Sequence, residues 1–113
     1  MSSIPLSQAI LLSSSDLTQY EVTRDYPRPD RLVTGNPERL TYSQYEHPHM
    51  SCGIWHCQVG AWNIQFAENK QEFFQVIEGI VRIHDAKTSS FIEVVAGNAG
   101  IIPPAFVGTL EVI

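Results

Sequence analysis

The sequence predicts an all-β domain that closes into a barrel or a two-sheet jelly roll, and three observations support this prediction. From residue 53 onward, short runs rich in Ile, Val, Phe and Trp are bounded by Gly, Asn, Pro or Ser, which is typical of strands and turns. No apolar repeat with helical spacing continues for a dozen residues. A chain of many short antiparallel strands must also hide its edges, which closure into a barrel or a two-sheet jelly roll achieves.

The elements follow in order along the chain. Residues 1–30 are polar and rich in Ser, and we expect an extended N-terminal arm with a short helix near 16–20 capped by Ser15. Residues 31–113 are expected to form the barrel domain. Its first part carries turn signals at Gly35-Asn36-Pro37 and His47-Pro48-His49, between short Tyr-rich pieces. We predict strands over residues 53–58, 61–67, 72–78, 80–85, 91–95, 99–103 and 107–112.

Composition narrows the function classes. The chain has 113 residues, which is the length of one domain, and 43% of them are hydrophobic. Seven Lys and Arg against twelve Asp and Glu give a net charge of −5 with no basic cluster, so we expect neither nucleic acid nor a membrane as a partner. The two cysteines and the absence of a basic N-terminal region favour a cytoplasmic location.

Two glycine-bounded segments carry a resemblance to a known family. The segment GAWNIQFAENKQEFFQVIEG at residues 60–79 and the segment GNAGIIPPAFVG at residues 97–108 resemble the two motifs of the cupin superfamily. More narrowly, the chain resembles the small single-domain cupins that are similar to the cupin domains of ureidoglycine aminohydrolases and ethanolamine-utilisation accessory proteins. This resemblance implies a double-stranded β-helix of the RmlC-like jelly-roll type, which often forms a homodimer.

The resemblance also implies where a metal would bind, and most of those ligands are missing. Metal-binding cupins have histidines at the positions of Phe66, Glu68 and Gly108, and a glutamate at the position of Glu72. Only Glu72 matches as it stands, with Glu68 a substituted carboxylate. Leu110 stands where the narrower family tends to have Trp. We therefore expect no metal cofactor, although a divalent ion held by Glu72, Glu68 and a histidine from elsewhere remains the alternative.

Strand alternation groups the candidate ligand-binding residues. It places Phe74 on the same face as Glu72, and Phe66 and Trp62 on the same face as Glu68. With Leu110, these residues predict a barrel mouth in which carboxylates are ringed by aromatic side chains, which suits an amine or another cation. The alternative is that the aromatic residues are ordinary core and that Glu68 lies in a solvated turn.

A second cluster of polar residues invites a zinc interpretation. His47, His49, Cys52, His56 and Cys57 lie close together in the sequence, but their spacing differs from the paired ligands of structural zinc sites. We interpret the segment as a loop leading into a strand, with a cysteine acting as a small buried residue. Elsewhere, His84 alternates with Val81 and Ile83, so it is expected to face outward.

No nucleophile motif, phosphate-binding loop or nucleotide fingerprint is present, so the catalytic residues stay unknown. We favour a metal-poor domain, expected to be a homodimer, that binds a small polar or amine-type metabolite. One alternative is a metal-dependent enzyme acting on a ureide, amine or sugar derivative. The other is an accessory or structural subunit that pairs with an enzyme.

Overall fold

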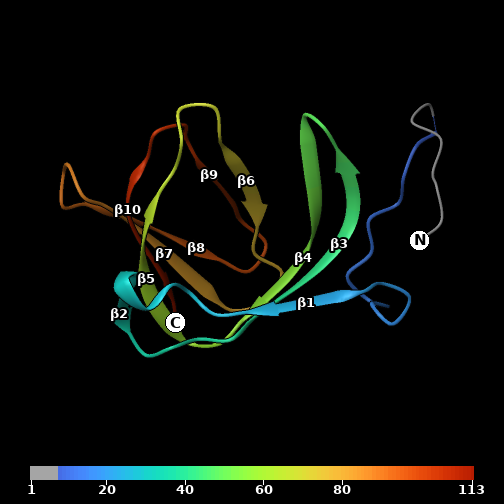
Figure 1. The fold of residues 1–113 in the computed structure, drawn as a ribbon, viewed down its shortest axis with the longest axis horizontal. Helices are drawn as coiled ribbons and strands as arrows, with labels where there is room; N and C mark the ends of the chain where they lie inside the picture. The colour runs from blue at the N-terminus through green and yellow to red at the C-terminus, as the bar shows by residue number, and fades with distance from the viewer. Residues whose placement is uncertain (1–7) are drawn as a thin grey trace. The chain divides into compact units, whose positions relative to one another are not determined.

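A computed structural model describes residues 8–113, and over this range all of the regular secondary structure except one short 3-10 helix is β-strand (Figure 1). Its elements are β1 (Val22–Asp25), the 3-10 helix η1 (Pro29–Arg31), β2 (Leu32–Thr34), β3 (Arg39–His47), β4 (Met50–Cys57), β5 (Gly60–Gln65), β6 (Glu72–Gln75), β7 (Ile80–Asp85), β8 (Phe91–Val95), β9 (Ala99–Ile102) and β10 (Val107–Val112). Within the described range, no helix is long and apolar enough to cross a membrane.

The chain divides into two compact units. The first unit comprises the chain up to Arg24 together with Leu40–His56. In it the predicted turn at His47-Pro48-His49 joins β3 and β4. Gln44 of β3 is 7% exposed, and its side chain both accepts a hydrogen bond from the backbone N–H of Ser13 (3.0 Å) and donates one to the Ser13 carbonyl (2.6 Å). This paired contact holds the N-terminal arm against β3.

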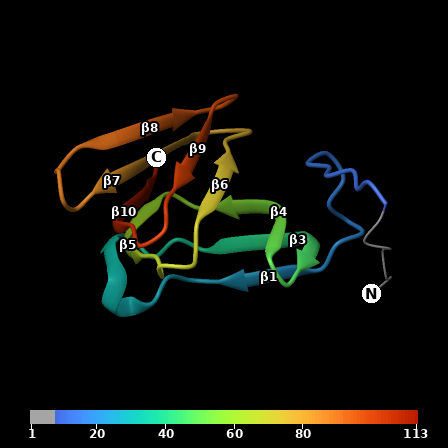
Figure 2. The same ribbon diagram turned by 90° about the horizontal axis from the view of Figure 1, so that it is seen from above.

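The second unit comprises Asp25–Arg39 and Cys57–Ile113, and it contains two sheets. One has five strands in the order β2-β5-β10-β7-β8, and the other pairs β6 with β9. Figure 2 shows β7 running beside β8, and β6 beside β9. These pairs are antiparallel, as are those of β10 with β5 and β7. The predicted all-β jelly-roll class is therefore confirmed.

The core of the second unit lies between the two sheets. Trp62 and Ile64 of β5, Ile83 of β7 and Ile102 of β9 are each at most 9% exposed and form one cluster. Successive side chains in a strand point to opposite faces. Trp62 and Ile64 are two residues apart in β5, so both point toward the core. Burial of each large apolar side chain contributes about 1.5–3 kcal/mol. This burial stabilises the packing of the two sheets against each other.

The structure also corrects part of the sequence prediction. The seven predicted strands all exist, within a few residues of their expected bounds. The prediction of a helix near 16–20 is wrong, because these residues form a turn. The Asp16 carboxylate accepts hydrogen bonds from the backbone N–H (3.2 Å) and the hydroxyl (2.7 Å) of Thr18, and such contacts favour a turn over a helix. Strands β1, β2 and β3 were not predicted. Residues 1–7 of the predicted arm lie outside the described residues.

Candidate functional site

Four of the predicted ligand-binding residues come together around the core of the second unit. Trp62 is buried there, with Phe66, Phe74 and Leu110 partly buried against the same cluster. The Arg39 guanidinium covers the Trp62 ring at 5.2 Å and is itself held by two hydrogen bonds to the Asp25 carboxylate (2.7 and 2.9 Å). Trp62 therefore lies within the packed interior, while Phe66, Phe74 and Leu110 keep partly accessible surface.

Glu72 lies at the start of β6 on the face that looks toward the core. Its partner across the β6–β9 pair is Ile102, which is 1% exposed, and directly opposite residues share a face. The neighbouring pair, Phe73 and Ile101, faces the other way, with exposures of 70% and 63%. Glu72 is still an exposed residue, as is Glu68. Burial by the surrounding atoms nevertheless raises the pKa of its carboxyl, and the Lys70 ammonium partly opposes this rise.

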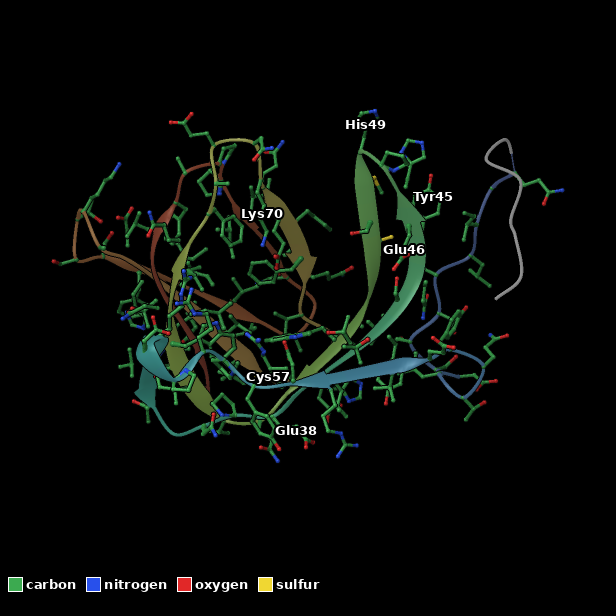
Figure 3. The ribbon with its side chains drawn as sticks, in the orientation of Figure 1. Glu38, Tyr45, Glu46, His49, Cys57 and Lys70 are labelled. Carbon is green, nitrogen blue, oxygen red and sulfur yellow. The ribbon has the colours of Figure 1, made fainter. Side chains whose placement is uncertain are left out.

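Lys70 is a site residue that the sequence did not point to. Its ammonium nitrogen lies 4.4 Å from the centre of the Phe66 ring, and its charge acts on the Glu72 carboxyl. In Figure 3 this residue lies in the connection between β5 and β6. A cation that lies over an aromatic face and also acts on a partly desolvated carboxylate is the combination expected for recognition of an ammonium group.

Glu68 differs from Glu72 in its surroundings. It occupies the turn between β5 and β6, where the backbone N–H of Lys70 donates to the carbonyl of Ala67 (3.2 Å), and its side chain is exposed. The alternative of a solvated turn therefore describes Glu68 correctly. The candidate site is centred on one carboxylate, Glu72, with Phe66, Phe74 and Lys70 around it.

The position that matches the third cupin histidine cannot hold any side chain. Gly108 is buried on β10, between Ile64 of β5 and Asp85 of β7. A Cβ atom added to Gly108 would collide with the His84 carbonyl oxygen and would lie 2.7 Å from the Phe106 ring. Phe106 therefore fills the space into which a residue at this position would project.

The donor set in the interior consequently does not fit a divalent metal ion. The Phe66 side chain has no atom that can bind a metal ion, and Gly108 has neither such an atom nor room for one. Glu68 lies in an exposed turn. A single carboxylate at Glu72 falls short of the three or four protein ligands that such ions use.

The His- and Cys-rich segment is spread over a hairpin. Figure 3 shows His49 at its tip, and the backbone N–H of His49 donates to Nδ1 of His47 (3.2 Å), whose ring stacks on Tyr45 at 6.2 Å. His56 packs edge-on against Tyr42 at 5.7 Å. Between residues 8 and 113, no group of three or more His, Cys, Asp or Glu is placed to hold a metal ion.

Cys57 belongs to the core of the second unit instead. It packs against the buried cluster, as the interpretation of a small buried residue predicts. Burial raises the pKa of its thiol to about 11. The charge of Arg39 lowers this pKa by a smaller amount, and the charge of Asp25 raises it slightly. The thiolate is the reactive form, so Cys57 is not placed to act as a nucleophile near neutral pH.

Comparison with known proteins agrees with this arrangement. A family model described as the EutQ-like cupin domain matches residues 46–113, which is more than half of the chain. None of the curated proteins matches the chain significantly.

Proposed function

Because the chain belongs to the EutQ-like cupin domain family, we propose that it binds a small amine-type metabolite where Glu72, Phe66 and Phe74 lie. The ligand's ammonium group pairs with the Glu72 carboxylate and lies over the Phe66 ring, and its apolar part contacts Phe74. Trp62 supports this surface from within the core, and Leu110 packs against that core.

The observation that carries the proposal is the position of Lys70. Its ammonium nitrogen lies over the Phe66 ring at 4.4 Å and interacts with Glu72, so the chain's own cation occupies the place of the ligand. The attraction between an ammonium and a carboxylate is stronger where protein atoms displace water. Lys70 is on a turn and exposed. A free amine can therefore displace it without disturbing the core.

The function that we propose involves no metal ion. The interior retains one of the four ligands of a cupin metal centre, and Phe106 closes the position of another. We therefore propose a binding function, in which the charge of Glu72 and the aromatic rings of Phe66 and Phe74 contact the ligand.

Thermal unfolding with a series of small primary amines tests the proposal. Propylammonium should raise the melting temperature of the wild-type protein, with a shift that grows with the logarithm of concentration above the dissociation constant. Glu72→Gln removes the charge and keeps the shape, so it should abolish most of the shift. Glu78→Gln makes the same change in an exposed turn and should keep the full shift.

Two results would contradict the proposal. One is an equal amine-dependent shift in Glu72→Gln and Glu78→Gln, which would show that the amine acts through general ionic effects. The other is the absence of any shift in the wild type across the millimolar range, while neutral propanol behaves identically to propylammonium.

A further inference from the structure

The outer face of the five-stranded sheet carries a hollow that is separate from the Glu72 region. Its volume is about 310 Å³, and it spans four neighbouring strands of the sheet. The lining residues are Val33 and Thr34 of β2, Ala61 of β5, Thr109 and Glu111 of β10, and His84 of β7.

Strand alternation explains both the place and the depth of the hollow. Ala61 precedes the core residue Trp62, and Thr109 and Glu111 flank Leu110, so all three point away from the core. Glu111 pairs directly with Ala61 across β10 and β5, and Thr34 pairs with Ala61 from β2. Because alanine has only a methyl side chain, the surface between its larger neighbours is depressed at this point.

The polar groups of the hollow are mainly hydrogen-bond acceptors. Nε2 of His84 lies 2.9 Å from Oε1 of Glu111. Since an ionised carboxylate only accepts, Nε2 carries the hydrogen of this contact and Glu111 is its acceptor. The hydroxyl of Thr109 donates to Oδ1 of Asn63 (2.9 Å), so its oxygen can only accept further hydrogen bonds.

The charges on this face leave a negative site beside the hollow. Arg82 is the neighbouring cation, and its guanidinium donates to Glu93 at 2.8 Å while lying 4.0 Å from Glu111. Two carboxylates, Glu93 and Glu111, therefore face one guanidinium and one imidazole. The chain as a whole also carries a net charge of −5, which disfavours an anionic ligand and favours a cation.

We propose that this hollow is a second binding site, for the primary ammonium group of a small molecule with a short apolar tail. The N–H donors of an ammonium match two acceptors that line the hollow, the Glu111 carboxylate and the Thr109 hydroxyl oxygen. Val33 and Ala61 provide the apolar wall for the tail. The inference does not depend on the Glu72 site, because the two sites lie on opposite sides of the five-stranded sheet and share no residue.

An NMR titration with propylammonium at about pH 8, where histidines are mostly neutral, tests the second site. Saturable shifts are expected at the amides of Thr34, Ala61 and Thr109 and at the His84 ring. Glu111→Gln should weaken binding at these residues by at least about tenfold. Thr109→Val, which removes one acceptor at nearly constant volume, should weaken it by about two- to fivefold.

The controls separate the two sites. Glu72→Gln should leave the titration of the hollow unchanged, and Glu78→Gln repeats the charge change of Glu111→Gln at an exposed turn. The second site is refuted by shifts that do not saturate, or by shifts at Thr34 and Ala61 that persist unchanged in both Glu111→Gln and Thr109→Val. Absence of any shift on the outer face refutes it as well, whatever happens at Glu72.

Discussion

Replacement of Lys70 by Gln tests whether the chain's own cation competes with a ligand. In the wild-type protein the Lys70 ammonium lies 4.4 Å from the Phe66 ring and acts on Glu72. A bound amine must displace that ammonium before it can take the same position. Removal of the charge should therefore strengthen amine binding at Glu72, which is the opposite of the effect expected for a residue that contacts the ligand favourably.

The size of the effect follows from the contact that is lost. A cation over an aromatic ring at an exposed position contributes about 0.5–1 kcal/mol. A ligand that no longer has to break this contact gains the same amount, which corresponds to about a two- to fivefold decrease in the dissociation constant. Removal of the repulsion between Lys70 and the incoming ammonium acts in the same direction and is reduced by salt.

Isothermal titration with propylammonium at fixed ionic strength measures this change. Lys87→Gln is the matched control, because it removes the same charge from the exposed turn between β7 and β8. Amine affinity should rise in Lys70→Gln and stay at the wild-type value in Lys87→Gln. An unchanged or weaker affinity in Lys70→Gln would refute the competition between Lys70 and the ligand.

Four further predictions concern stability, reactivity, assembly and metal content. The pKa of Glu72 is raised in the folded state, so ionisation of Glu72 lowers the stability of the protein as the pH rises. The Glu72→Gln variant should therefore have a higher melting temperature than the wild type at about pH 7, and this difference in melting temperature should disappear toward about pH 3. Iodoacetamide should alkylate Cys57 far more slowly in the native than in the unfolded protein, as measured by mass spectrometry at about pH 8. Light scattering should give a dimer mass of twice 12.7 kDa, because Phe73 and Ile101 form an exposed apolar pair that a second copy can cover. Deletion of residues 1–25 should weaken the dimer. A measured mass near 12.7 kDa would contradict the predicted dimer. Elemental analysis should find less than about a tenth of an equivalent of Fe, Mn, Ni or Zn, and a stoichiometric metal would contradict the binding function.

Local pattern was sufficient to predict the strands that build the core. The alternation of Trp62, Ile64 and Phe66 places these residues on one face, and the structure packs all three in one cluster. The same reasoning separates Phe73 from Phe74, one exposed and one against the core. These predictions succeed because the side-chain period of a strand is a local property that needs no knowledge of its partners.

The part of the chain before residue 50 was predicted less well for a physical reason. Strand β3 is rich in Thr, Tyr, Ser and Gln and has no alternation of apolar residues. Its conformation depends on partner strands and on contacts such as that between Gln44 and Ser13, which are separated by 31 residues. Such pairing is a tertiary effect, and intrinsic β-propensity reports it poorly.

The candidate site was only partly predictable. Glu72, Phe66 and Phe74 follow from the motif and from alternation, but the position of Lys70 over Phe66 depends on the geometry of a turn. The Phe106 ring likewise blocks the space where a side chain at position 108 would lie. This contact depends on tertiary packing, which the local sequence does not show. A Lys two residues before the motif glutamate was the available signal, and on a polar turn it is ordinarily a solvated charge.

The loss of the cupin histidines changes what the remaining carboxylate can bind. An interior with several imidazoles offers neutral nitrogen donors to a metal ion, whereas Phe66 and the Phe106 ring beside Gly108 offer only apolar surface and ring faces. In such surroundings the ionised form of Glu72 is disfavoured, as the direction of its pKa shift indicates. A partner that carries one positive charge offsets this cost, and an ammonium also gains from the ring face of Phe66. In the function that we propose, the same two substitutions that weaken a metal site therefore favour an organic cation.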